Sequence, residues 1–186
     1  MKILDIMKNS AHLLGLTYEL ATLETVRPDC EDEVFQDRDL NRMLALTRFA
    51  IQELCTNYIP ICCEAKFTTN NKEIGLANIT NCLKVLRVAN ENGEVKFKII
   101  NRKIILENDG EYIVKYTTYP EIKSVYDDLE FVSSLSPDIA VLALCSYYSL
   151  SVGMFDTFKS FYEQYTEVAE SLKQLKMFDL PTRRWV

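Results

Sequence analysis

The chain has 186 residues, of which 48% are hydrophobic and 26% charged, a composition typical of a globular protein that buries its core without metals or disulfides. No apolar run approaches the length that spans a bilayer, so we expect a soluble protein with no membrane partner. The net charge of -6 argues against a protein whose main task is to bind nucleic acid phosphates, but it is compatible with an acidic wall past which DNA slides.

The cysteines and the first residues give an expectation for the cellular compartment of the protein. Residues Met1 to Asp5 include an acid where a secretory signal keeps its apolar stretch unbroken, so we expect no targeting segment. Six cysteines lie far apart in a chain without an export signal, which favours reduced, buried and inert thiols. They are Cys30, Cys55, Cys62, Cys63, Cys82 and Cys145.

Two helices are predicted before residue 60. Apolar residues recur at helical spacing from about residue 2 to 14, and Gly15 follows as a C-cap. After an acidic linker, Asp37 or Asp39 can cap a longer helix that Pro60 stops. The apolar positions of this helix are Leu40, Met43, Leu44, Thr47, Ile51, Leu54, Cys55 and Tyr58.

A small antiparallel sheet is predicted after Pro60, because the period changes to alternation and β-branched residues accumulate. The clearest hairpin pairs residues 83–88 with 94–99 through Asn92-Gly93, which tolerates the positive φ of a tight turn. A second hairpin is predicted between residues 102–107 and 111–118. The last strand should carry Tyr112, Val114 and Tyr116 on one face and Ile113, Lys115 and Thr117 on the other.

Two further helices are predicted after the sheet, which Pro120 ends. The segment from Ile122 to Ser136 is irregular and acidic, and Ser136-Pro137 opens a helix to about residue 150 that is apolar nearly all round. A helix of this kind must be covered on every side. Gly153 marks the turn to a fourth helix, roughly 155–175, whose apolar stripe should pack against the third helix.

The predicted fold is α+β. Two N-terminal and two C-terminal helices form a four-helix bundle, a small antiparallel β subdomain lies between them, and an extended tail follows. The expected boundaries are 1–60 for the N-terminal helices, 61–120 for the β subdomain, 121–175 for the acidic connection with the C-terminal helices, and 176–186 for the tail.

The residue patterns predict no catalytic, cofactor or metal site. His12 is the one histidine and reads as an ordinary helix-face residue. Cys62 and Cys63 are adjacent on a predicted strand, so they point to opposite faces and fit one zinc ion poorly. No glycine-rich phosphate-binding loop occurs. The connection carries Asp127, Asp128 and Glu130, and a solvated loop or an acidic interface is favoured over acid/base chemistry there.

The tail ends in Arg183, Arg184 and Trp185, residue types that are enriched where proteins anchor to one another. One interpretation is a frayed terminus. The other is a partner-binding segment, in which Trp185 fills a pocket on a partner and the arginines pair with acids at its rim.

In their order, these elements resemble the head-to-tail adaptor, or head-completion, proteins of tailed bacteriophages. Four features carry the resemblance and cover most of the chain. They are the opening helices with Ala11–Gly15, Asp39–Leu44 and Tyr58–Pro60; the sheet ending in Asp109–Tyr116 and Tyr119-Pro120; the connection from Asp127-Asp128-Leu129-Glu130 to Leu135–Pro137; and the helix Ala140–Leu150 with its partner bearing Phe161–Tyr165.

The resemblance implies a non-enzymatic virion protein, made in the host bacterial cytoplasm, that forms a ring at the head-tail junction. The ring, commonly of twelve subunits, would join the portal protein to the tail proteins and continue the DNA channel. Tyr147 and Tyr148 are then candidates for a subunit interface, because their helix needs more cover than a four-helix unit easily supplies. Asp127, Asp128 and Glu130 are candidates for a channel or interface surface. The alternative is a soluble bacterial adaptor or regulatory binding module, and a small enzyme or thiol-based metal protein is a third hypothesis.

Overall fold

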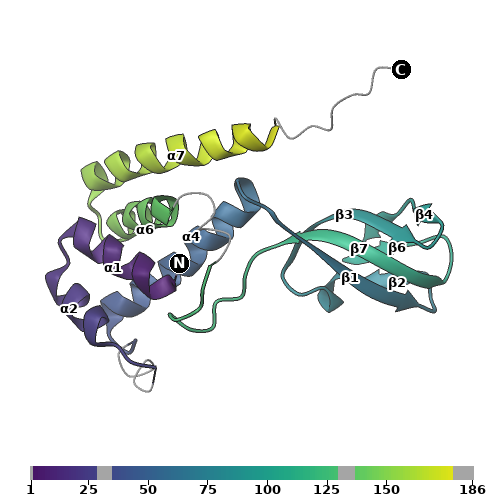
Figure 1. Cartoon of the computed structure of the whole chain (residues 1–186), viewed down its shortest axis with the longest axis horizontal. Coiled ribbons are helices and arrows are strands. Elements are labelled where there is room, and N and C mark those ends of the chain that lie inside the picture. Colours follow the sequence, from purple (N-terminus) through teal and green to yellow (C-terminus); the bar gives the residue numbers. More distant parts are fainter. Residues whose placement is uncertain (1, 29–34, 130–136, 178–186) are drawn as a thin grey trace. The chain divides into compact units, whose positions relative to one another are not determined.

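The computed structural model describes residues 2–28, 35–129 and 137–177 (Figure 1). The fold is α+β with antiparallel sheets, as predicted. The chain divides into two compact units, one formed by residues 1–59 with 122–186 and the other by residues 60–121. We call them the helical unit and the β unit and describe each by itself.

The helical unit has five helices in the described residues, and their bounds agree with four of the sequence predictions. Gly15 ends the first helix with a φ of 70°, a left-handed conformation that glycine adopts freely. Asp37 caps the long helix as expected, because its carboxylate accepts hydrogen bonds from the backbone N–H groups of Asp39 and Leu40. The helices are α1 (Ile3–Leu14), α2 (Thr17–Thr25), α4 (Arg38–Asn57), α6 (Pro137–Ser151) and α7 (Phe155–Met177).

The predicted four-helix bundle is wrong. Helix α2 was not anticipated, because Leu23 alone is buried in its nine residues and no apolar stripe marks it in the sequence. The helices also do not form a bundle with a central β subdomain. Instead, α6 packs against α1, α4 and α7, and α2 packs on α1. This arrangement follows from the composition of α6, which is apolar on all sides.

The chain itself covers most of α6, up to its last turn. Ile139 and Leu144 are 0% exposed and Tyr148 is 4% exposed, although these side chains project from different sides of the helix. Polar contacts also join α6 to α1, since the Ser10 hydroxyl donates to the carbonyl oxygen of Val141 at 3.4 Å. Most of this helix is therefore covered within one chain, and the assignment of Tyr147 and Tyr148 to a subunit interface stays a prediction.

The β unit contains two antiparallel sheets. One has the strand order β1-β7-β3-β4 and the other the order β2-β6-β5. The first sheet consists of β1 (Ile61–Thr69), β7 (Gly110–Thr118), β3 (Cys82–Asn90) and β4 (Gly93–Glu94). The second consists of β2 (Glu73–Gly75), β6 (Lys103–Ile105) and β5 (Lys98–Ile100), and a short 3-10 helix (Leu76–Asn78) follows β2. The longest ladder joins β1 to β7, from Ile61 opposite Thr118 to Thr69 opposite Gly110.

The first predicted hairpin is right about its place in the chain, one residue off in its turn, and wrong about its length. Asn90 pairs with Gly93 and Ala89 with Glu94, so the residues between the paired positions are Glu91 and Asn92. The N–H of Val95 still donates to the carbonyl oxygen of Val88 at 2.9 Å, but β4 itself has only two residues. Residues Lys98–Ile100 form β5 in the other sheet.

The second predicted hairpin is wrong. β6 and β7 belong to different sheets, and β6 pairs instead with β5. The tight turn lies between those two strands, where Asn101 and Arg102 have φ values of 50° and 60°. Positive φ at both central residues is the geometry of the turn that best matches strand twist.

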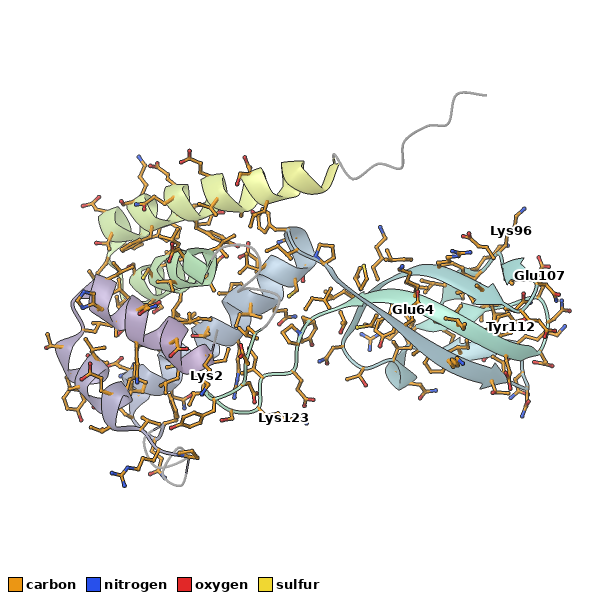
Figure 2. The ribbon with its side chains drawn as sticks, in the orientation of Figure 1. Lys2, Glu64, Lys96, Glu107, Tyr112 and Lys123 are labelled. Atoms are coloured by element: carbon orange, nitrogen blue, oxygen red, sulfur yellow. The ribbon has the colours of Figure 1, made fainter. Side chains whose placement is uncertain are left out.

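One hydrophobic core lies between the two sheets of the β unit. Tyr112 and Val114 of β7 and Val88 of β3 pack with Ile104 of β6, and all four are at most 3% exposed. Tyr116 packs against the same cluster, while Ile113 is 39% exposed. The predicted faces of β7 are therefore confirmed for the residues of the core. Figure 2 labels Tyr112 on β7 and Glu64 on β1, the neighbouring strand of the same sheet.

Candidate interaction surfaces

The turn between α6 and α7 exposes an unusual run of apolar side chains. Leu150 is 43% exposed, Val152 37%, Met154 44% and Phe155 66%. The turn is built by Gly153, whose φ is 80°, and by the N–H of Met154, which donates to the carbonyl oxygen of Ser149 at 2.8 Å. The chain therefore holds these side chains at a defined place in contact with water.

The same surface continues along α7. Tyr162 is 39% exposed and its ring lies 5.2 Å from that of Phe158, one helical turn earlier. The predicted stripe of α7 is thus buried deeply only from Tyr165 onward, where Tyr165 and Ala169 are 0% exposed. We call the set of Leu150, Val152, Met154, Phe155 and Tyr162 the apolar α6–α7 surface. Several large exposed apolar side chains close together in the sequence are a candidate binding surface for another protein.

A carboxylate joins the three helices beneath this surface. Glu53 on α4 accepts hydrogen bonds through the same oxygen from the hydroxyl groups of Tyr147 on α6, at 2.7 Å, and Tyr165 on α7, at 2.6 Å. Aromatic rings surround this contact, with the ring of Phe49 5.0 Å from that of Tyr147 and the ring of Tyr58 6.0 Å from that of Tyr165. We call Glu53, Tyr147 and Tyr165 the tyrosine–carboxylate cluster.

Burial keeps both tyrosines of the cluster protonated. It raises the pKa of Tyr147 and of Tyr165 far above the ordinary value of 10.0, and the hydrogen bond to Glu53 and the charge of its carboxylate raise both further. The two hydroxyl groups therefore act as hydrogen-bond donors at any physiological pH, which suits a structural contact between helices.

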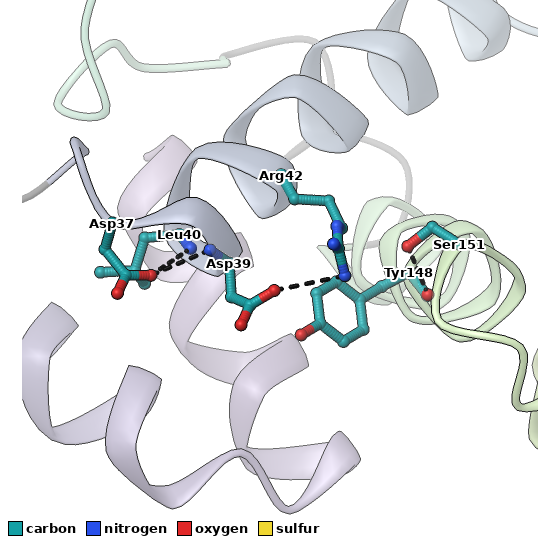
Figure 3. A network of polar contacts seen from close by, with 6 residues as sticks. All are labelled: Asp37, Asp39, Leu40, Arg42, Tyr148 and Ser151. Atoms are coloured by element: carbon teal, nitrogen blue, oxygen red, sulfur yellow. Dashed lines mark hydrogen bonds and ion pairs between the residues drawn. The ribbon is translucent and has the colours of Figure 1, made fainter.

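A second polar network lies at the N-terminus of α4 (Figure 3). Asp39 forms an ion pair with Arg42 at 3.2 Å, and the ring of Tyr148 lies beside that arginine. Burial raises the pKa of the Tyr148 hydroxyl, and the charge of Asp39 adds to the effect. The Ser151 hydroxyl donates to the Tyr148 carbonyl oxygen at 2.8 Å, near the end of α6. Both tyrosines that the sequence assigned to a subunit interface therefore have partners within their own chain.

The acids of the connection stabilise a loop. The Asp127 carboxylate accepts hydrogen bonds from the backbone N–H groups of Lys123, at 2.7 Å, and Ser124, at 3.0 Å. The carbonyl oxygen of Asp127 accepts from the N–H of Ile3, and Asp128 pairs with Lys2 in an isolated β-bridge. Figure 2 labels Lys2 and Lys123 at this contact. Glu130 lies outside the described residues, as do the tail residues Arg183, Arg184 and Trp185.

The cysteines differ in exposure. Cys55 and Cys145 are buried as predicted, whereas Cys62 is exposed and Cys63 and Cys82 are half-buried; Cys30 lies outside the described residues. Burial raises the pKa of Cys145 to about 11, with a smaller opposing effect from its contact with Ser10. In the described part of the chain, no group of three or more His, Cys, Asp or Glu residues is placed to hold a metal ion.

The β unit has a polar hollow of about 650 Å³ at one end. Its walls come from β1, from the β3–β4 turn and from the start of β7. Asp109 is engaged there, because its carboxylate accepts from the N–H of Lys72 at 2.6 Å, and the Tyr112 hydroxyl donates to the Asn108 carbonyl oxygen at 2.9 Å. These polar groups hold the loops of the β unit together.

Two features of these surfaces were not foreseen. Tyr147 and Tyr165 lie 94 and 112 residues after Glu53 in the sequence, so no local pattern could indicate that the three meet. The exposed α6–α7 turn did have a signal, since apolar residues flank Gly153 on both sides. In the sequence, only the stripe Phe158, Phe161, Tyr162 and Tyr165 indicates packing between helices.

In the comparisons with known proteins, no family model matches the chain and no curated protein matches it. Among the helices of the described residues, none combines the length and the apolarity that a membrane crossing requires.

Proposed function

We propose that this protein is a non-enzymatic structural component of a tailed-phage virion. It forms a ring, commonly of twelve subunits in the family it resembles, that joins the portal protein to the tail proteins at the head-tail junction. The apolar α6–α7 surface is the observation that carries the proposal, because a ring contact between identical subunits buries such a surface against a different patch of the next copy.

The tyrosine–carboxylate cluster supports this role. A surface that must transmit load between subunits needs a fixed position, and Glu53 ties α6 and α7 to α4 through two short hydrogen bonds. Hydrogen bonds to a charged group are stronger than those between neutral groups. The two helices that the α6–α7 turn connects are therefore both joined to α4.

The net charge of -6 suits a subunit that lines a DNA channel without holding the DNA. Asp128, beside the start of α1, and Glu130 are the acids we propose for the channel or for an interface. The carboxylate of Asp127 already stabilises the loop through its hydrogen bonds. In the same proposal, Arg183, Arg184 and Trp185 bind the portal or a tail protein.

Assembly of the full chain tests the proposal. Native mass spectrometry and electron microscopy should show rings, and the protein should bind portal rings of the same virus. The double variant Met154→Ser/Phe155→Ser should lose ring formation with its melting temperature unchanged, because both side chains are exposed. Ile99→Ser is the matched control, since Ile99 is 50% exposed on β5 of the other unit. A parent protein that stays monomeric and fails to bind portal rings would overturn the proposal.

The tail provides a separate test. Deleting residues 182–186 should weaken binding to the portal or tail partner more than it lowers thermal stability. Equal binding by the truncated protein would refute the role proposed for Trp185 and the two arginines.

A further inference from the structure

Strand β1 is a long sheet edge. Its nine residues pair with β7 on one side, and no strand of the described residues pairs with it on the other. The other edges of the two sheets are much shorter, since β4 has two residues and β2 and β5 have three each. A long strand edge offers a row of free N–H and C=O groups to another strand.

The exposed face of β1 carries both signs of charge. Cys62, Glu64, Lys66 and Thr68 are exposed, and the residues between them are half-buried. Glu64 also ends a row of charges that crosses the sheet: its carboxylate lies 3.6 Å from the Lys115 ammonium group on β7. At the other side of the same sheet, Arg87 pairs with Glu94 at 3.3 Å. The row therefore ends at the β1 edge with the negative charge of Glu64. A positively charged side chain of another strand would fit next to it.

We propose that β1 pairs with β1 of a second copy of this chain, antiparallel and centred on Ala65. In that register, Glu64 of each copy lies opposite Lys66 of the other, so the two-fold axis produces two opposite-charge pairs on the exposed face. On the half-buried face, Cys63 lies opposite Phe67 of the other copy. Directly opposed pairs of this kind are the units that stabilise a sheet.

Other pairings of the same two edges are disfavoured by charge. Centring the antiparallel pair on Glu64 places two carboxylates opposite each other, and centring it on Lys66 places two ammonium groups opposite each other. A parallel, in-register pair opposes like charges at both positions. Like charges directly across a strand pair are destabilising, so the charges of β1 favour the register centred on Ala65 over these three.

This contact goes beyond the proposed ring. A two-fold contact uses the same patch on both copies and cannot close a ring by itself, whereas the ring contact proposed above joins different patches. The two proposals also concern different units of the chain, so each can fail without the other.

Charge exchange tests the pairing. The full chain carrying Met154→Ser/Phe155→Ser, which removes the proposed ring contact, should dimerise in sedimentation experiments. Adding Lys66→Glu or Glu64→Lys should raise the dissociation constant of the dimer about tenfold or more, because each turns two attractive pairs into two repulsive ones. An equal mixture of the two variants should dimerise as well as the parent, since the acids of one copy then face the lysines of the other. A monomeric parent, or a mixture no better than its components, would overturn the proposal.

Cross-linking tests the register. In a Cys62→Ser/Cys63→Ser background, Ala65→Cys places two thiols directly opposite each other at the two-fold axis, within reach of a disulfide. Oxidation with copper phenanthroline should then link the two copies covalently. Thr68→Cys is the matched control, because the two thiols would lie about 20 Å apart along the strands. Equal cross-linking of the two variants, or none with Ala65→Cys, would contradict the register.

Discussion

The tyrosine–carboxylate cluster makes the sharpest stability prediction. Tyr147→Phe and Tyr165→Phe each remove one hydroxyl group and keep the ring, so the packing of α4, α6 and α7 is unchanged. Each hydroxyl donates to the same oxygen of Glu53. A hydrogen bond to a charged group contributes about 1.5–3 kcal/mol, and because Glu53 is half-buried and reaches water, we expect about 1.5 kcal/mol for each single variant.

The double variant should lose more than the sum of the single variants. When one tyrosine is lost, the carboxylate oxygen keeps the other donor and its charge strengthens that bond. When both are lost, the carboxylate has neither donor, so we expect about 4 kcal/mol, with a coupling energy of roughly 1 kcal/mol between the two sites.

Urea unfolding of the four proteins gives this coupling energy directly. Tyr126→Phe is a useful control, because that hydroxyl donates to the carbonyl oxygen of Val26 at 2.9 Å and does not touch Glu53. Its loss of unfolding free energy should add independently to the loss caused by Tyr147→Phe or Tyr165→Phe. Additive losses at Tyr147 and Tyr165, or a total below about 1 kcal/mol, would refute the view that Glu53 joins the three helices.

The remaining predictions concern pH, a helix cap, a loop and a thiol. Because the pKa of Tyr165 is raised in the folded protein, the unfolded chain loses this proton first, so the contribution is complete below pH 10 and falls above it by about 1.4 kcal/mol per pH unit. Tyr165→Phe should reduce the slope of the unfolding free energy above pH 10 by that amount when unfolding is measured between pH 9 and 11, while Tyr147, whose pKa is also raised, keeps its own contribution. Asp37→Ala should lower the free energy of unfolding by about 1 kcal/mol, whereas Asp37→Asn should change it little, because asparagine also caps helices well. Asp127→Ala should speed hydrogen exchange at the amide of Ile3, whose acceptor is the carbonyl oxygen of Asp127, and unchanged exchange would contradict the loop's role. At pH 8, a thiol reagent should label Cys62 rapidly and Cys145 only on unfolding, because Cys145 is buried and its pKa is raised to about 11.

The helices could be predicted because their signals are local. Gly15 and Asp37 mark helix ends by their backbone and capping chemistry, and both act in the structure as the sequence indicates. Helix α2 could not be found in this way. Its single fully buried residue, Leu23, gives no period, and its position depends on packing against α1.

Strand pairing was harder to predict than strand existence. β1 pairs with β7 across the whole length of the β unit, and no local rule connects Ile61 with Thr118. In the turn between β5 and β6, only one of the two central residues indicates such a turn in the sequence. Asn101 is a residue that tolerates positive φ, but Arg102 is not, and its φ of 60° follows from the pairing of the strands around it.

The β1–β7 ladder also determines how the β unit is connected to the rest of the chain. Ile61 and Thr118 face each other as neighbours in the sheet, so the chain enters and leaves the β unit at one place, about 5 Å apart. A unit whose two ends are neighbours is the kind of insertion that domain exchange tolerates, so another domain with adjacent ends could replace residues 60–121.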